Sequence, residues 1–142
     1  MNVPQIVIDT NVLVSGLRSN RGPSFRLLQL VGTNSFGIHL SVPLVIEYKD
    51  VLTRPTSELA IDSTEAEKII AFHCSVAKRH RIFFLWRPFL PDPKDDMVLE
   101  VAVKAQCDFI VTFNDRDFKG VEKFGLRIIK PTDFLKLIGD RL

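Results

Sequence analysis

The stretch Gln5–Ser15, with the sequence QIVIDTNVLVS, decides how the rest of the chain is interpreted. It begins with three consecutive β-branched apolar residues, Ile6–Ile8, which predict a short buried strand. Asp9 follows at once and would lie at the carboxyl end of that strand, where open α/β sheets place their ligands. Equally, Asp9 or Asn11 could simply cap the helical turn that begins at Val12. The other acids of the chain have to decide between the two interpretations.

Composition indicates an ordinary globular protein of 142 residues, 46% hydrophobic and 25% charged, and we expect one domain spanning 1–142. The net charge of +2 does not by itself indicate a nucleic-acid binder, so any basic footprint must be local. Cys74 and Cys107 lack zinc-ligand spacing; reduced thiols are favoured over a disulfide, which favours a cytoplasmic location. We expect neither a signal peptide nor a membrane span, because no apolar run approaches about 18 residues.

Strand and helix patterns alternate along the whole chain. The predicted strands are 6–8, 36–40, 81–86, 108–113 and 126–129, and the predicted helices are 12–17, 23–31, 42–54, 63–78, 95–106 and 134–138. This order predicts an α/β fold, a three-layer α/β/α sandwich around a mostly parallel sheet of about five strands. Helix 63–78 is expected to turn Phe72 and Val76 inward and to end in the basic run Lys78–Arg81.

Acids other than Asp9 stand where predicted helices meet the sheet. Glu47 falls on the margin of the apolar face of helix 42–54, so it can face a cleft, although a solvent-facing glutamate is the plainer interpretation. Asp95 and Asp96 open a helix that is apolar around most of its circumference, and acids suit the positive end of its dipole. Capping needs only one of the two, so we assign the functional role to Asp96.

Two further acids, Asp115 and Asp117, follow the fourth predicted strand. Together with Asp9, Glu47 and Asp96 they would converge at the carboxyl end of the predicted sheet. At an effective dielectric near 20, each pair of carboxylates about 4 Å apart costs ~4 kcal/mol. Such a cluster of acids is therefore tolerable only if a cation is bound, if some of the acids are protonated, or if the groups stay apart. Because no His or Cys partners accompany the acids, the donor set favours Mg²⁺ or Mn²⁺ over zinc. Such ions serve phosphate chemistry.

These motifs, in this order, resemble those of the PIN-domain family, and more narrowly the VapC-like PIN toxins of prokaryotic toxin–antitoxin pairs. The resemblance rests on IVIDTNVLVS at 6–15, Glu47, DDMVLEVA at 95–102, and IVTFN at 110–114 followed by Asp117-Phe118, and it spans essentially the whole chain. It implies a metal-dependent endoribonuclease that cleaves single-stranded RNA with Mg²⁺ or Mn²⁺. It also implies a cognate antitoxin partner and a homodimer.

Residue by residue, Asp9, Glu47 and Asp96 match the first three acids of the family. The resemblance implies that Asp9 and Asp96 hold the ion directly, and that Glu47 ligates through water or orients the nucleophile. Thr112 matches a hydroxyl beside the site and Asn11 a polar neighbour, and Asp95 is given a supporting role.

The fourth acidic station departs from the family pattern. Asn114 stands where the family often has an aspartate, and Asp115 and Asp117 lie next to it. Asp117 fits the Asn-x-x-Asp-Phe variant of the motif better, and either acid could complete the metal site. This departure supports the alternative function: a catalytically weak or inactive PIN-like module that binds RNA or protein.

Further alternatives concern the substrate and the fold. Arg18, Arg21, Arg79 and Arg81 are hypothetical contacts to the RNA backbone, although the last two equally suit a solvated helix end. DNA in place of RNA stays open, because no residue reads a 2′-hydroxyl. A receiver domain is set aside because strand 81–86 ends without a phosphoacceptor aspartate, and a haloacid-dehalogenase-like phosphatase because position 11 is asparagine.

Overall fold

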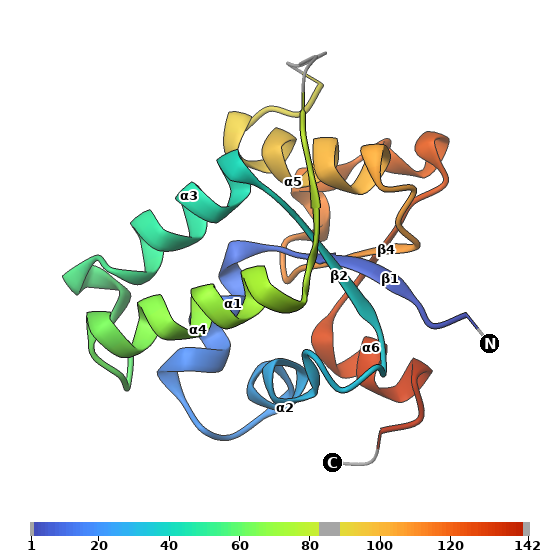
Figure 1. Cartoon of the computed structure of the whole chain (residues 1–142). Coiled ribbons are helices and arrows are strands. Elements are labelled where there is room, and N and C mark those ends of the chain that lie inside the picture. The colour runs from blue at the N-terminus through green and yellow to red at the C-terminus, as the bar shows by residue number, and fades with distance from the viewer. Residues whose placement is uncertain (1, 83–88, 141–142) are drawn as a thin grey trace.

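In the part of the chain that the structure describes, five parallel strands form a central sheet, in the order β3-β2-β1-β4-β5 (Figure 1). The computed structural model describes residues 2–82 and 89–140. The strands are β1 (Gln5–Ile8), β2 (Gly37–Ser41), β3 (Lys78–His80), β4 (Phe109–Val111) and β5 (Arg127–Ile129). The predicted parallel α/β sheet is therefore confirmed.

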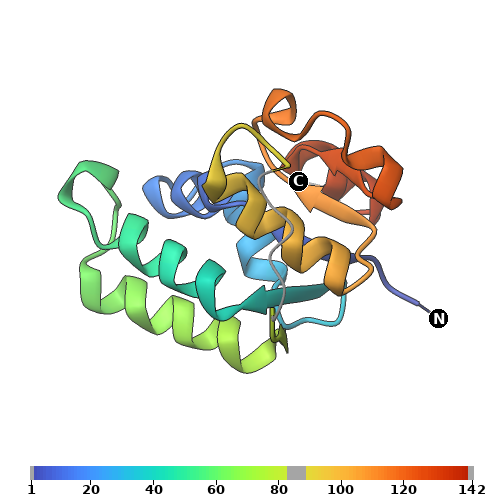
Figure 2. The same cartoon turned by 90° about the horizontal axis from the view of Figure 1, so that it is seen from above.

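Within the described residues, six helices and three short 3₁₀ turns complete the fold. The helices are α1 (Thr10–Arg18), α2 (Pro23–Leu30), α3 (Val42–Leu52), α4 (Ser63–Val76), α5 (Pro93–Lys104) and α6 (Pro131–Leu137), and the turns are Pro55–Ser57, Asp115–Phe118 and Val121–Phe124. Helix α5 packs on β1, β2 and β4, whereas α2 and α6 pack together across the sheet from it (Figures 1 and 2). None of the described helices is long and apolar enough to cross a membrane.

The direction of the chain reverses between β1 and β4. From β1 it moves outward through β2 to β3, and it then returns by way of α5 to β4 on the other side of β1. Open α/β sheets bind their ligands outside the carboxyl ends of the strands at such a switch point. The ends of β1 and β4 are therefore the first place to look for a functional site.

Strand β1 lies in the middle of the sheet, between β2 and β4. Ile6, Val7 and Ile8 are almost completely excluded from solvent, and fully burying one such side chain stabilises a fold by roughly 1.5–3 kcal/mol. Tyr48 on α3 is also buried, and its hydroxyl donates a hydrogen bond to the carbonyl of Ile8. This bond fastens α3 to the carboxyl end of β1, so that Glu47 is held near Asp9.

Helix capping differs from the predictions in two places. Asp92, not Asp95 or Asp96, caps α5, and its carboxylate accepts from the backbone N–H of Lys94 at 2.9 Å. Pro93 at the first helical position explains the shift, because proline is favoured there and the cap precedes it. Likewise Asp62 caps α4, ahead of the expected Ser63 or Thr64. Neither acid of the Asp95-Asp96 pair is thus needed as a cap.

The sequence favoured the basic run Lys78–Arg81 as the end of a helix, and this prediction is wrong. Helix α4 ends at Val76, and Lys78–His80 form the edge strand β3, which pairs in parallel with β2. Most of the predicted strand 81–86 lies outside the described residues. A three-residue polar strand has no apolar alternation, so sequence periodicity could not reveal it.

Side-chain hydrogen bonds reinforce the pairing of β2 with both of its neighbours. The His39 ring donates from Nε2 to Gln5 Oε1 at 2.6 Å, and its Nδ1 lies 2.8 Å from Nε2 of His80, which donates to it. Gly37 leaves room for these hydrogen bonds, because a side chain at this position would collide with the side-chain amide of Gln5. We refer to Gln5, His39 and His80 as the histidine link.

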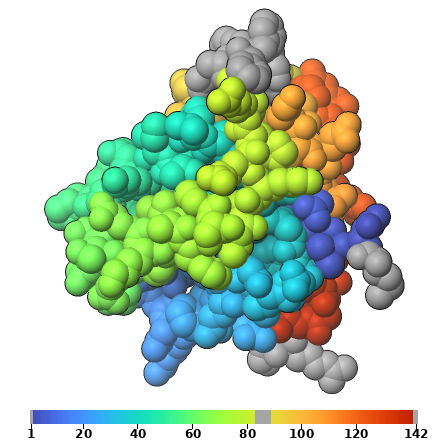
Figure 3. All heavy atoms as spheres, in the orientation of Figure 1, coloured from blue at the N-terminus to red at the C-terminus, as the bar shows by residue number. Residues whose placement is uncertain are grey.

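Two of the apolar positions expected inside α4 face outward. Phe72 is 49% exposed and Val76 is 41% exposed, because α4 packs on the rest of the molecule through Ala66, Ile70 and His73. Figure 3 shows α4 and β3 covering much of one face of the molecule. Cys74 and Cys107 are free thiols, as expected.

Candidate active site

Asp9 occupies the predicted position at the end of β1 and is only 8% exposed. Its Oδ1 accepts from the backbone N–H of Thr10 at 2.8 Å and so caps α1, while Oδ2 accepts from the hydroxyl of Thr112 at 2.7 Å. The capping interpretation is therefore confirmed for one oxygen. The other oxygen fixes the carboxylate against the end of β4.

Thr112 links the ends of β1 and β4. Its hydroxyl donates to Asp9 and accepts from the backbone N–H of Asn114 at 3.0 Å, with the Asn11 amide nitrogen 3.4 Å away. Thr112 is fully buried, so water does not compete for these bonds. The residues expected beside the site thus contact each other, and Thr112 contacts the first acid.

Several acids lie close enough to act on each other electrostatically. Burial raises the pKa of Asp9 above its usual value, and the negative charges of Asp117 and Glu47 raise it further. Burial also raises the pKa of Asp95 to about 7, with additional contributions from Asp9, then Asp92, and also Asp117. Asp117 and Glu47 thus make ionisation of Asp9 less favourable, and Asp9 and Asp117 do the same for Asp95. We call Asp9, Glu47, Asp95 and Asp117 the acidic edge.

Asp96 is more deeply buried than Asp95 and is held differently. Its Oδ1 accepts from the backbone N–H groups of Leu90 at 3.1 Å and Phe89 at 3.4 Å, which ties the start of α5 to the preceding segment. Its buried Oδ2 has no hydrogen-bond partner among the described residues. Asp96 therefore offers one uncommitted oxygen, whereas Asp95 shares the electrostatic field of Asp9 and Asp117.

The two acids in the loop after β4, Asp115 and Asp117, differ in their electrostatic effect on the other acids. In the part of the chain that the structure describes, Asp117, and not Asp115, is the acid of this loop whose charge acts on Asp9 and Asp95. Asn114 contributes its backbone N–H to Thr112. These charge interactions favour Asp117 over Asp115 as the fourth acid of the group.

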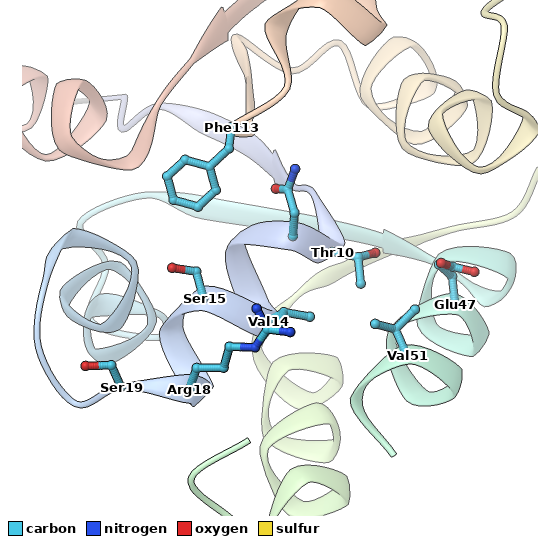
Figure 4. A pocket seen from close by; sticks show the side chains of 9 residues that line it. Thr10, Val14, Ser15, Arg18, Ser19, Glu47, Val51 and Phe113 are labelled. Carbon is cyan, nitrogen blue, oxygen red and sulfur yellow. The ribbon is translucent and has the colours of Figure 1, made fainter. Parts of the chain in front are cut away.

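A hollow of about 650 Å³ adjoins the acidic edge between α1, α3 and the loop after β4 (Figure 4). Of the four predicted RNA-contacting arginines, Arg18 lines this hollow, and its Nε donates to the carbonyl of Ser57 at 2.7 Å. Arg21 is exposed in the loop after α1, whereas Arg79 and Arg81 line a separate hollow beside β3. The structure therefore does not gather the four arginines into one surface.

Two residues of the site were missed by sequence reasoning. The Lys94 ammonium lies 4.0 Å from Oε1 of Glu47, whose side chain is 12% exposed, so a cation stands beside this acid. Phe113 borders the hollow and is 38% exposed. Lys94 could have been found from its position directly before Asp95-Asp96. Phe113 carried no such signal, because it continues the apolar pattern of β4.

Comparison with known proteins identifies the family. The PIN domain family model matches residues 5–116. The chain belongs to the PIN-domain family. Its fold is similar to a chain in the crystal structure of VapBC2 from Rickettsia felis bound to a DNA fragment from their promoter, with a TM-score of 0.58 at 14% identity over 87% of this chain and 98% of that one. At this identity, the likeness concerns the fold alone. The comparison of the sequence with curated proteins found no match. PIN domains are generally nucleases.

The acids of this PIN domain suit a hard divalent cation in their chemistry. Within residues 2–82 and 89–140, no three His, Cys, Asp or Glu side chains converge closely enough to enclose a metal ion. Mg²⁺ commonly uses only one or two carboxylates and keeps several waters, so such an enclosure is not required. The uncommitted Oδ2 of Asp96 and the raised pKa values of Asp9 and Asp95 both indicate carboxylates that a cation would stabilise. The donor set therefore fits.

Proposed function

We propose that this PIN domain is a divalent-metal-dependent endoribonuclease that cleaves single-stranded RNA. The observation that carries the proposal is the acidic edge: buried Asp9 directly follows β1 at the switch point of the sheet, and the negative charges of Asp117 and Glu47 oppose its ionisation. Grouping like charges in a partly buried site is costly, and perturbed carboxyl groups of this kind are typical of functional sites. A cation bound there would offset the repulsion.

Each acid has a proposed role. Asp9 and Asp96 hold Mg²⁺ or Mn²⁺ directly, and Asp117, with Asp115 as the alternative, completes the site. When bound, the ion lowers the pKa of a water molecule and offsets negative charge on the phosphate. Glu47 orients the attacking water or accepts its proton.

The neighbouring residues position these acids. Thr112 keeps Oδ2 of Asp9 in one orientation through the 2.7 Å hydrogen bond, with Asn11 close to the same hydroxyl. Lys94 balances part of the charge of Glu47. Asp95 adds negative charge beside Asp9 and so increases the attraction of the site for a cation.

In the cell, we propose the role of a toxin in a toxin–antitoxin pair, acting in the cytoplasm as a homodimer until an antitoxin binds. The fold likeness to a chain of the VapBC2 complex supports this role. Co-purification with the product of an adjacent small reading frame, and loss of growth inhibition when both are expressed, would test it. Growth inhibition that the neighbour does not relieve would contradict it.

The second candidate is a non-catalytic module that binds RNA, favoured by Asn114 at a position where the family often has an acid. The test incubates fluorescent single-stranded RNA with Mg²⁺, Mn²⁺ or EDTA and compares wild type with Asp9→Asn. Asp133→Asn, an exposed acid at the start of α6, serves as the matched control. Thermal unfolding with and without each metal gives a second readout that does not depend on cleavage.

We expect cleavage with metal by wild type and by Asp133→Asn, and loss of both cleavage and metal-induced stabilisation in Asp9→Asn. Absence of cleavage by folded, RNA-binding wild type in either metal would contradict the nuclease proposal and leave the binding module. A matching single-stranded DNA in the same assay decides which nucleic acid is cut.

A further inference from the structure

The hollow beside the acidic edge is lined by side chains of α1 and α3 and by Phe113. One wall is a single face of α1, on which residues recur four apart: Thr10, Val14 and Arg18 in one row, and Asn11, Ser15 and Ser19 in the next. Val51 and Glu47 of α3 form the opposite wall, and Phe113 borders the hollow from the end of β4 (Figure 4). Its volume of about 650 Å³ falls within the ~300–1,000 Å³ typical of ligand pockets.

Phe113 is unusual within its own segment. Phe109, Ile110, Val111 and Thr112 before it are buried, whereas Phe113 is 38% exposed and borders the hollow (Figure 4). An exposed aromatic ring beside a polar site gains little from the core, but its free face can stack on a flat ligand. In proteins that bind single strands, such rings carry nucleobases.

Charge is distributed in the hollow in a way that suits a nucleotide. Glu47 is its acid and lies on the wall of α3, while the two rows on α1 carry hydroxyl, amide and apolar side chains that end at Arg18. The bond from Arg18 Nε to Ser57 fixes the base of the guanidinium. The remaining N–H groups of Arg18 are geometrically suited to a phosphate oxygen.

Electrostatics alone would hold RNA weakly at this site. The chain has a net charge of only +2, and the acidic edge repels a polyanion wherever a cation does not offset it. A strand whose phosphate must lie against carboxylates therefore needs contacts that do not depend on charge. Stacking of a base supplies them, at ~1–3 kcal/mol per base.

We propose that the hollow is a base-binding subsite for single-stranded RNA, in which the nucleobase next to the cleaved phosphate stacks on Phe113. Val14 and Val51 contact the base from the two helices, Ser15 and Asn11 can hydrogen-bond to its edge, and Arg18 binds a flanking phosphate. The inference rests on the proposed nuclease function for its choice of RNA. It adds a specificity-determining residue, Phe113, outside the group of acids.

The first test measures RNA binding without cleavage, so that it does not depend on nuclease activity. Fluorescence anisotropy with a short single-stranded RNA in EDTA compares wild type with Phe113→Ala and Phe113→Tyr. Phe72→Ala is the matched control, because Phe72 is also an exposed phenylalanine but borders a different hollow between α2 and α4. We expect Phe113→Ala to weaken binding roughly 5- to 150-fold and Phe113→Tyr and Phe72→Ala to bind like wild type.

A second measurement reports stacking directly. Trp86 is the chain's single tryptophan, so Phe113→Trp combined with Trp86→Phe leaves one indole, at the hollow. Quenching of its fluorescence by RNA, but not by an RNA of the same length with abasic positions, would support the subsite. Phe72→Trp in the same background should not be quenched.

The outcomes separate this inference from the proposed function. If Phe113→Ala binds RNA as wild type does, or RNA leaves the indole at position 113 unquenched, the subsite is wrong even where metal-dependent cleavage is present. If Phe113 governs binding but no metal supports cleavage, the subsite stands and the nuclease proposal fails.

Discussion

The acidic edge and the histidine link both place titratable side chains in partly or wholly buried positions, but they do so in opposite ways. In the histidine link, both ring nitrogens of His39 and Nε2 of His80 have hydrogen-bond partners, and burial lowers the pKa values of both rings, which favours their neutral form. In the acidic edge, hydrogen bonds to Asp9 do not outweigh burial and neighbouring negative charge, and the pKa values of Asp9 and Asp95 rise.

The difference is one of compensation. The hydrogen bonds of the histidine link are made within the chain. In the acidic edge the charges of Asp9 and Asp95 are not compensated in this way, so that protonation or a bound cation would stabilise them, as our proposal requires. The two regions should therefore respond in opposite directions to pH, and only the acidic edge should respond to metal.

The largest expected effect comes from the two acids in the loop after β4. Asp117→Asn should reduce metal-dependent RNA cleavage by roughly 100-fold, the upper end of what losing a group around a metal site costs. Asp115→Asn should change it little, because Asp115 is not among the charges that act on Asp9 or Asp95. Single-turnover cleavage by both variants measures the difference. A larger loss in Asp115→Asn would reverse our assignment of the fourth acid.

A smaller effect is expected at Thr112, which positions Asp9. Thr112→Val keeps the shape of the side chain but removes the hydrogen bond to Oδ2, and we expect about tenfold weaker metal binding with a matching loss of cleavage. Thr112→Ser restores the hydroxyl and should restore both. Calorimetric titration with Mn²⁺ gives the affinity. If Thr112→Val binds Mn²⁺ as tightly as wild type, Thr112 has only a packing role.

Sequence reasoning placed Asp9 at the end of β1 and gave the fold class, because both depend on local patterns. Asp9 directly follows an apolar run, whereas Thr112 was singled out by the family resemblance, since the predicted strand continued to Phe113. Their contact depends on the parallel pairing of β1 with β4. The histidine link was missed, since His39 and His80 come together only through the pairing of β2 with β3, and β3 has no apolar alternation. The different settings of Asp95 and Asp96 also depend on a tertiary contact, the backbone of Leu90, which periodicity does not report.

The histidine link should make the protein less stable in acid. The pKa of His39 falls from 6.5 to about 4, chiefly through burial, so below pH 6.5 the unfolded chain takes up a proton that the folded protein refuses. Stability is therefore full above pH 6.5 and is lost as the pH falls toward 4.

We expect His39 to contribute about 1–2 kcal/mol to this loss, after allowing for the partial exposure of the pair. Urea unfolding of the metal-free protein from pH 7 to pH 4.5, compared between wild type and His39→Gln, isolates the contribution. Equal pH slopes for the two proteins would show that the link does not control acid stability.

The acidic edge should produce the opposite slope, and Asp95 is the residue on which to measure it. Its pKa rises from 3.8 to about 7, so the folded protein holds a proton that the unfolded chain has already lost. Stability therefore falls as the pH rises between these values, and the cost is complete above pH 7.

Asp95→Asn removes the ionisable group, and we expect the metal-free variant to be more stable than wild type by about 1 kcal/mol at pH 8 and equal to it near pH 4. Saturating Mg²⁺ should cancel or reverse this advantage, because a bound cation favours the charged form of Asp95 in wild type. An advantage that persists unchanged in Mg²⁺ would mean that the repulsion at the acidic edge is not relieved by a metal, and the functional side of the comparison would lose its main physical support.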